Sequence, residues 1–372
     1  MSDSQVVSNQ VVVHGAAEGA HHEHLPYQRH HFETYAQQSD ATNFAMWLFL
    51  LTEIMFFGGL FTAYLIYRNW YYPAFVEASH QLQIFWGTAN TAVLITSSFT
   101  MAMGVWSAEM KKKGALVLCL VITFILGIVF LGIKTIEYSE KIEKHHVPGF
   151  HYSMQSFLNP QSDPEVYKEY KDKPLPYDMA RHTEIYFFLY FAMTGMHALH
   201  MIIGIAILGF MIFRARAGAY TTGHVTFVEN FGLYWHFVDI IWIYLFPLLP
   251  HQQAPIRINA MSAPHDKDFE SIEQHEHEHH IVSPRIYLTI VCVLLIMTGL
   301  TVAASYVEMG IFNPIVALAI AAFKMILVVL FFMHVKYSTK LTKLTVGAGV
   351  FTFLILVGMT LSDYWTRAWG RW

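Results

Sequence analysis

The residues best suited to chemistry are histidines and carboxylates in two neighbouring apolar stretches of the sequence. His197 and His200 lie three residues apart in one stretch, and Glu229, His236 and Asp239 follow in the next. Residues spaced by three, four or seven positions share one face of a helix. The spacing therefore predicts a polar seam between two helices, in which imidazoles and carboxylates form buried hydrogen bonds.

A metal site is the alternative interpretation of this seam, because imidazole and carboxylate are also good metal ligands. A di-iron carboxylate bundle requires Glu-x-x-His motifs on facing helices, and neither Glu53 nor Glu229 has a histidine at that spacing. We favour the hydrogen-bonded seam and expect no metal in this chain. The His/Glu run at 275–280 could hold a divalent ion weakly, but nothing there fixes a coordination geometry, so we favour a solvated segment.

Two further ionisable residues lie in the middle of apolar stretches. Glu53 is surrounded by apolar side chains in residues 51–57, and removal from water favours the neutral acid, so we expect Glu53 to be protonated at neutral pH. Its role stays open between a proton-linked or regulatory carboxyl and a structural one hydrogen-bonded to a neighbouring helix. We interpret Lys324 as structural, either extended toward the membrane surface or paired with a carboxylate.

The sequence contains no recognisable redox or nucleotide-binding motif. Cys119 and Cys292 lie in different apolar stretches and are too few for a disulfide framework or a cysteine-rich metal site. Haem needs axial His, Met or Cys ligands, and a dinuclear copper centre needs a cysteine pair. Three histidines on two helices cannot supply two haems and a copper. We therefore expect this chain to bind no cofactor of that kind and to carry out no catalysis alone.

Composition places these residues in a membrane. Of the 372 residues, 55% are hydrophobic and 13% are charged, whereas soluble domains carry about 25% charged residues. A helix needs roughly 20 apolar residues to cross a bilayer. Eight stretches qualify, namely 44–67, 84–106, 114–138, 184–213, 226–249, 286–305, 312–335 and 344–365. We therefore predict an all-α membrane protein with eight transmembrane helices.

Polar segments divide these helices into two domains. Residues 1–43 form a polar, His-rich tail without a signal-peptide pattern, and residues 44–250 form a five-helix domain. Residues 251–284 form a linker rich in His and Glu, and residues 285–372 form a three-helix domain. Within the linker, Met261-Ser262-Ala263-Pro264 resembles the start of a new polypeptide.

The basic residues predict conflicting orientations for the two domains. Short loops rich in Lys and Arg stay in the cytoplasm. Lysines 111–113 follow the second span, and Arg214 with Arg216 follows the fourth, so both loops should be cytoplasmic and the fifth span should end outside. Lys336, Lys340 and Lys343 follow the seventh span, so by the same rule the sixth span should begin inside. The linker is too polar to cross the membrane. Either the three-helix domain is inserted against the charge rule, or two polypeptides meet near Met261, and we favour the second hypothesis.

Five motifs resemble, in the same order, those of subunit III of haem-copper terminal oxidases. Residues 52–58 resemble the segment that holds a buried, carbodiimide-reactive glutamate, here Glu53. Residues 195–200 are similar to the family's Gly-x-His-x-x-His, and residues 234–242, Tyr-Trp-His-Phe-Val-Asp-Ile-Ile-Trp, resemble its most recognisable stretch. The remaining matches are Asn90-Thr91 and Glu137-Tyr138, with Glu229, Trp235 and Trp242 also at motif positions.

The C-terminal part, residues 262–370, is similar to the three-helix prokaryotic subunit IV. The motif that carries this likeness is Lys324-Met325-Ile326-Leu327-Val328, followed by Phe331-Phe332-Met333-His334. Its position after the subunit III-like part supports the likeness.

The resemblance implies an accessory subunit of an aerobic respiratory oxidase of the cytochrome c oxidase type in a bacterial cytoplasmic membrane. Subunit I would reduce oxygen to water and pump protons, and haem and copper would lie in partner subunits I and II. This chain would hold structural phospholipid and support assembly and proton uptake.

Two alternatives remain to this interpretation. The matching subunit of a quinol oxidase or a nitric oxide reductase shares these helices, so the chain alone does not distinguish the electron donor. A proton-coupled transporter would use Glu53, Glu229 and Asp239 instead. It would need two related halves with broken helices, and the sequence shows no such halves.

Overall fold

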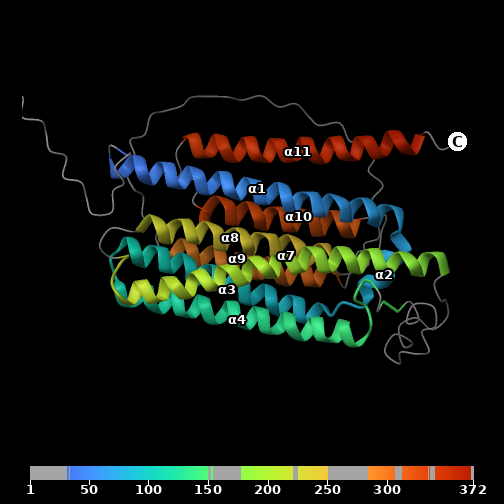
Figure 1. Cartoon of the computed structure of the whole chain (residues 1–372), viewed down its shortest axis with the longest axis horizontal. Helices are drawn as coiled ribbons and strands as arrows, with labels where there is room; N and C mark the ends of the chain where they lie inside the picture. The colour runs from blue at the N-terminus through green and yellow to red at the C-terminus, as the bar shows by residue number, and fades with distance from the viewer. Residues whose placement is uncertain are drawn as a thin grey trace, which may run out of the picture.

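The structure is a computed structural model that describes residues 32, 34–149, 152–153, 177–220, 225–249, 284–305, 312–333, 335 and 340–369. The regular elements in these ranges are all helices (Figure 1). They are α1 (Tyr35–Trp70), α2 (Tyr72–His80), α3 (Ile84–Glu109), α4 (Lys113–Glu143), α7 (Tyr177–Arg216), α8 (Val225–Leu248), α9 (Pro284–Ser305), α10 (Phe312–Leu327), the π-helix η2 (Val328–Phe332) and α11 (Lys340–Trp369). The predicted all-α class is therefore confirmed for the described residues.

Seven helices are long and apolar enough to cross a membrane, which makes the chain a multi-pass helical protein. These spans are Gln37–Trp70, Ile84–Glu109, Lys113–Glu143, Ala180–Arg216, Val225–Leu248, Pro284–Ala303 and Lys340–Thr360. They correspond to seven of the eight predicted stretches, with ends that differ by a few residues. The eighth stretch, 312–335, is helical in α10 and η2, but the apolar helix found within it, Ala319–Phe332, is shorter than a full span. The count of eight transmembrane helices stays a prediction.

Two differences from the sequence prediction have simple physical reasons. Helix α1 begins at Tyr35, so part of the predicted polar tail is helical, and Thr34 caps it by accepting a hydrogen bond from Gln37 N at 3.2 Å. A search for apolar stretches misses this end because a helix continues into polar residues once it has left the apolar layer. Helix α2 has nine residues with a proline in its first turn, and it was missed because it is too short to span a membrane.

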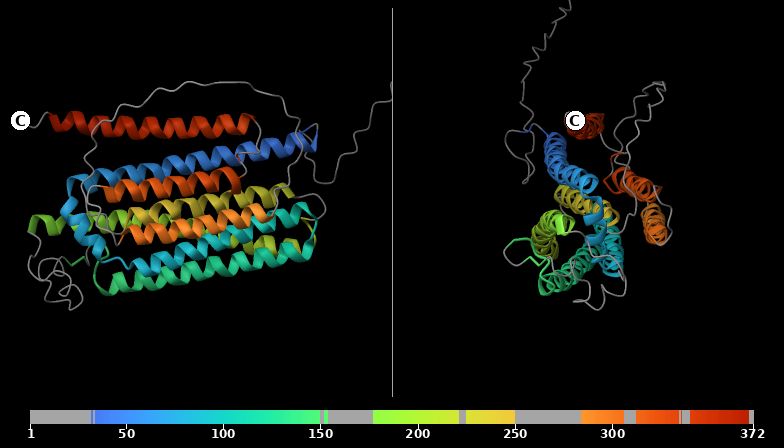
Figure 2. Two further views of the ribbon diagram at one scale, coloured as in Figure 1. Left: turned by 180° about the vertical axis from the view of Figure 1, so that it is seen from behind. Right: turned by 90° about the vertical axis from the view of Figure 1, so that its right-hand side faces the viewer.

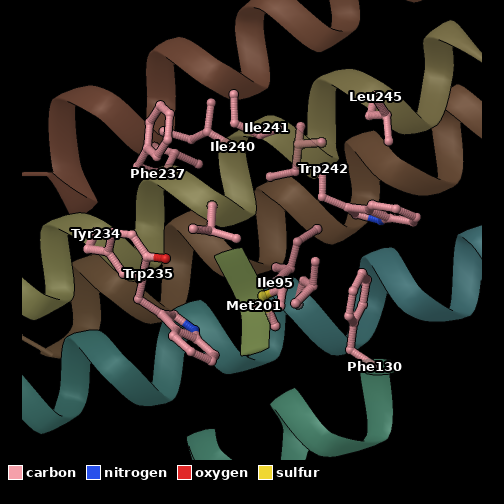
Figure 3. Close-up of a cluster of buried hydrophobic side chains, with 14 of the residues drawn as sticks. Ile95, Phe130, Met201, Tyr234, Trp235, Phe237, Ile240, Ile241, Trp242 and Leu245 are labelled. Atoms are coloured by element: carbon pink, nitrogen blue, oxygen red, sulfur yellow. The ribbon is translucent and has the colours of Figure 1, made fainter. Parts of the chain in front are cut away.

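Helix α8 lies at the centre of the bundle, with the other helices arranged around it (Figure 2). Its span is 94% buried, whereas that of α11, which packs against α1 at the edge, is 11% buried. The sequence explains this contrast, because α8 carries aromatic and aliphatic residues on every side. Figure 3 shows its side chains pointing in several directions, toward Ile95 of α3, Phe130 of α4 and Met201 of α7 among others.

The ring of Trp235 on α8 fills a space that two glycines leave open. A Cβ atom at Gly127 of α4 would lie 3.1 Å from Trp235 Cη2, and one at Gly204 of α7 would lie 3.1 Å from Trp235 Cζ3. Such distances are shorter than normal carbon contacts, so a side chain at either position would displace the ring. These glycines therefore set how closely α4 and α7 approach α8.

The segment after α4 is tied to the start of α7. The Gly149 N–H donates to Glu184 Oε1 at 3.1 Å, and the Tyr152 hydroxyl is hydrogen-bonded to Thr183. Burial raises the pKa of Tyr152 above its usual value, so its hydroxyl stays protonated in this contact. The predicted linker at 251–284 lies outside the described residues except for Pro284, which begins α9.

Replacing Gly127 by leucine should destabilise the bundle by about 1–3 kcal/mol, because the new side chain would force Trp235 and Ile205 apart. Gly132→Leu on the same helix is the control, since nothing lies within 4 Å of a Cβ there. Unfolding in mixed detergent micelles, followed by tryptophan fluorescence, measures both variants. Equal loss of stability in the two variants would contradict this account of the packing.

Candidate functional site

Three side chains of α8 are hydrogen-bonded to hydroxyl groups of α3. Trp242 Nε1 donates to Thr91 Oγ1 at 3.1 Å, and Trp235 Nε1 donates to Ser97 Oγ at 3.1 Å. His236 Nδ1 lies 2.7 Å from Ser98 Oγ. We call these three contacts the α3–α8 seam. They satisfy ring nitrogens that would otherwise be buried without a partner, which is costly in a water-free interior.

A second polar contact joins α7 to α1. His200 Nε2 lies 3.1 Å from Glu53 Oε2, and His200 Nδ1 lies 2.8 Å from the Met196 carbonyl oxygen of its own helix. The His200 and Glu53 side chains remain 12% and 20% exposed on the bundle. The Tyr234 hydroxyl also donates to the His200 carbonyl at 2.8 Å. Glu53 is therefore hydrogen-bonded to a neighbouring helix, as its structural interpretation expects. This pair lies at the surface of the bundle and not in its centre.

A buried ion pair lies near the end of α4. Lys134 Nζ donates to Glu137 Oε2 at 2.8 Å, and the two side chains are 4% and 10% exposed. The Tyr190 hydroxyl donates to the other carboxylate oxygen, Glu137 Oε1, at 2.6 Å. The ammonium group also lies 4.8 Å from the ring centroid of Trp242. A charge-assisted hydrogen bond and a cation–π contact thus offset the removal of this lysine from water.

Tyr138, the second residue of the predicted Glu-Tyr motif, packs beside the Lys134–Glu137 ion pair. Its hydroxyl lies 2.6 Å from Thr194 Oγ1 on α7, and its ring centroid lies 5.5 Å from Lys134 Nζ. The motif therefore joins α4 to α7 through both of its residues.

Three buried polar side chains have two polar atoms each without a hydrogen-bond partner among the described residues. They are His197 with both ring nitrogens, Asn90 with both amide atoms, and Asp239 with both carboxyl oxygens. The His197 ring packs edge-on against Phe130 and at an angle to Trp242, with centroids 5.4 and 5.2 Å apart. Ser98 interacts with the Asp239 carboxyl, but neither oxygen meets hydrogen-bond geometry.

The structure places the five residues of the predicted seam in several different surroundings. His236 is bonded to α3 and His200 to α1, while His197 packs among aromatic rings. Glu229 lies near Glu109 at the end of α3. The prediction of a single hydrogen-bonded line between α7 and α8 is therefore corrected. It failed because these helices have more than one neighbour, and each polar residue meets the helix on its own side.

The remaining motif residues lie in the three-helix part. Lys324 is buried, and its Nζ donates to Thr301 Oγ1 of α9 at 2.9 Å. The partner that the structure shows is thus a hydroxyl and not a carboxylate. His334 lies outside the described residues.

The described side chains do not form a metal-binding group. Within the described ranges, no three His, Cys, Asp or Glu side chains come together closely enough to hold an ion. The histidines are separated, and their closest neighbours are hydroxyls, rings or one carboxylate. This donor set does not fit haem or copper. What the arrangement can do is fix helix positions through hydrogen bonds and expose one carboxyl–imidazole pair.

Several residues of the site were missed by sequence reasoning. Ser97 and Ser98 are small hydroxyl residues that occur throughout helices, so the sequence contains no signal that selects them. Thr91 stands in the Asn90-Thr91 motif, but nothing in the sequence relates it to Trp242. The Lys134–Glu137 pair did have a signal, because opposite charges three residues apart on a helix lie side by side.

Fold and site together define a multi-pass helical membrane protein whose interior polar groups join helices to one another. Comparison with curated proteins specifies the family. The chain is 31% identical over 216 residues to cytochrome c oxidase subunit 3 of Synechocystis sp., covering 56% of this chain and 75% of that protein. The chain therefore belongs to the cytochrome c oxidase subunit III family.

Other relatives and two family profiles agree with this assignment. Cytochrome c oxidase subunit 3 of Thermostichus vulcanus is 31% identical over 203 residues, covering 54% of this chain and 83% of that protein. A probable cytochrome c oxidase subunit 3 of Nocardia farcinica is 29% identical over 204 residues, covering 54% and 82%. The profile described as Cytochrome c oxidase subunit III matches residues 168–250, and that described as Prokaryotic Cytochrome C oxidase subunit IV matches residues 288–359. Both predicted resemblances are confirmed.

Glu137→Gln should destabilise the protein by about 3–5 kcal/mol, because it leaves the buried Lys134 ammonium without its carboxylate. The control is Glu140→Gln on the same helix, where the pair with Lys144 is 25–28% exposed and is expected to contribute about 0–1 kcal/mol. Replacing both buried partners, as Lys134→Met with Glu137→Leu, should restore most of the loss. The free energy of unfolding in mixed micelles checks all three variants, and an equal effect of Glu137→Gln and Glu140→Gln would refute the argument.

Proposed function

We propose that this chain is a non-catalytic accessory subunit of an aerobic terminal oxidase of the cytochrome c oxidase type. The observation that carries the proposal is that buried polar side chains of this chain are hydrogen-bonded to neighbouring helices. The tryptophan and histidine nitrogens of the α8 motif are engaged by hydroxyls of α3, so they serve helix packing and are not free for chemistry. The family assignment supports the same conclusion at the level of the whole complex.

The chain would support the catalytic subunit through its surface. Large apolar side chains are exposed along α1, α4 and α7, among them Phe56, Ile125, Phe188 and Phe210. In a bilayer such faces contact lipid or the helices of a partner. We propose that partner subunits I and II and structural phospholipid occupy them, and that assembly and proton uptake by subunit I depend on these contacts.

Haem and copper would then lie in the partner subunits. The described donors of this chain do not gather into a ligand set, which supports this division of labour. The membrane would be the bacterial cytoplasmic membrane. The equivalent subunit of a quinol oxidase or a nitric oxide reductase is the alternative, and a copper-binding cysteine motif in the co-purified subunit II would identify cytochrome c as the donor.

Purification of the tagged chain in mild detergent tests the proposal. We expect a haem absorption spectrum and an oxidase subunit I among the co-purifying proteins. Recovery of the chain without haem or partner subunits, from membranes that show oxidase activity, would contradict the proposed function.

Glu53→Gln should leave oxygen reduction by the assembled complex largely intact, because glutamine can still hydrogen-bond to His200 and, in this proposal, the redox groups lie in the partner subunits. A hydrophobic carbodiimide should label Glu53 in the unmodified protein, since its carboxyl is 20% exposed on the surface of the bundle and can be reached from the lipid. Glu137 is the internal control and should stay unlabelled, being ion-paired and only 10% exposed. Mass spectrometry of the labelled peptides and oxygen consumption are the measurements. Complete loss of turnover in a normally assembled Glu53→Gln enzyme would show the prediction to be wrong.

His236→Ala should reduce assembly before it reduces the rate of assembled enzyme. It leaves the buried Ser98 hydroxyl without its ring partner, at a cost of about 1–3 kcal/mol. His236→Asn is the matched variant, because its amide reaches about as far as the lost ring nitrogen. The amount of haem recovered per tagged chain reports assembly, and oxygen consumption per haem reports rate. A fall in rate per haem with unchanged assembly would contradict a structural role.

A further inference from the structure

Two tryptophans of α8, Trp235 and Trp242, lie seven residues apart and therefore two turns apart on one face of the helix. Trp235 is surrounded by Ser97 of α3, which accepts a hydrogen bond from its indole, and by Gly127 of α4 and Gly204 of α7. The Ser97 hydroxyl in turn donates to a backbone carbonyl of its own helix. We call these four residues the Trp235 layer, and its polar side-chain atoms all have partners within the protein.

A second layer surrounds Trp242, two turns further along the bundle. Each neighbouring helix has a polar residue seven positions from its residue in the first layer, namely Asn90 before Ser97, Lys134 after Gly127 and His197 before Gly204. Because α3 and α7 run antiparallel to α4 and α8, this step leads about 10 Å toward the same end of the bundle on all four helices. We call Asn90, Lys134, His197 and Trp242 the Trp242 layer.

Contacts in the structure place these residues around the Trp242 ring. Lys134 Nζ lies 4.8 Å from the centroid of the ring, and the centroid of the His197 ring lies 5.2 Å from it. The indole nitrogen donates at 3.1 Å to Thr91, the sequence neighbour of Asn90. Figure 3 shows the Trp242 ring with Phe130 of α4 beside it. The Trp242 layer therefore lies inside the bundle, between α3, α4, α7 and α8.

Unlike the Trp235 layer, the Trp242 layer carries polar atoms that no described residue satisfies. Both amide atoms of Asn90 and both ring nitrogens of His197 are buried without a hydrogen-bond partner among the described residues. The two side chains are 0% and 1% exposed, so bulk solvent does not reach them. Buried polar groups are nearly always hydrogen-bonded, and an internal water is the usual partner where the protein supplies none. Four such atoms in one layer therefore indicate a binding site for a small hydrogen-bonding molecule.

The chemistry of these four atoms selects water as that molecule. An asparagine amide offers two N–H donors and a carbonyl acceptor, and a neutral imidazole offers one donor and one acceptor. Water can serve all of them, because it both donates and accepts. A metal ion would engage only the acceptors and would be repelled by the Lys134 ammonium, which interacts electrostatically with His197. An anion would leave the Asn90 oxygen and one nitrogen of His197 unpaired.

We propose that ordered water molecules bind in the Trp242 layer, hydrogen-bonded to Asn90 and His197. They hydrate the plane of the bundle in which the Lys134–Glu137 ion pair begins, whereas the Trp235 layer two turns away stays closed by its glycines. The membrane-spanning core then contains one hydrated plane beside a dry one. The inference concerns this chain alone and does not depend on the oxidase assignment.

Substitution by side chains of similar shape tests hydration through stability. Asn90→Leu keeps nearly the same volume but removes the amide. With water bound, the thermal unfolding midpoint in mixed micelles should fall by a few degrees, because the water loses its partners. The double variant with His197→Phe has no unpaired group at either position, so its loss should be smaller than the sum of the two single losses. An unchanged or raised midpoint in Asn90→Leu would show a dry layer and overturn the proposal.

An electron cryo-microscopy map of the full-length protein, purified with its natural partners, decides the question even if these variants fail to fold. The map must resolve ordered waters at other buried polar groups. We expect water density at about 3 Å from the Asn90 amide and from a ring nitrogen of His197, and none between Trp235 and its two glycines. Well-resolved Asn90 and His197 side chains without water density beside either would overturn the proposal.

Discussion

The structure depends on one constraint, which is that polar groups carried into lipid must find their partners inside the protein. Helix α8 shows this most directly, because it is surrounded by other helices and carries Trp235, His236 and Trp242. Each of these rings meets a hydroxyl of α3. Trp242 meets Thr91, whereas Trp235 and His236 meet Ser97 and Ser98 further along α3, so the two helices are antiparallel. The α3–α8 seam thereby fixes the register of the pair. Gly127 of α4 and Gly204 of α7 then allow these two helices to approach the Trp235 ring closely.

The polar contacts lie at different depths below the surface of the bundle, and we infer different roles for the deep and the shallow ones. Lys134, Glu137 and His197 lie in the interior among aromatic rings, where protons exchange with water only through an opening of the bundle. Glu53 and His200 are both partly exposed on the bundle surface. A proton-linked role in this chain would therefore fall to the Glu53–His200 pair, and the deeper groups hold the helices that present it.

The sequence allows the helices and the unusual residues to be predicted, but not the pairs that those residues form. Apolar stretches are long and continuous, so seven spans were located correctly, and a charge within such a stretch is conspicuous. The partners are not conspicuous. Ser98 is one of many helical serines, and Glu53 and His200 are separated by 147 positions, so nothing local relates them. Spacing on α7 predicted that His197 and His200 share one face of the helix, but it could not reveal that His197 packs against α8 and His200 is bonded to α1.

The two parts of the chain also differ in how they are joined. Among helices α1 to α8, the interhelical contacts include the hydrogen bond from Tyr190 of α7 to Glu137 of α4 and the α3–α8 seam. Among helices α9 to α11, Lys324 of α10 donates to Thr301 of α9. Between α1–α8 and α9–α11, the contacts include close packing of Phe353 and Leu51 against glycines and of the His236 and Phe332 rings. Small residues that let helix backbones approach are typical of helices that associate after each has entered the membrane.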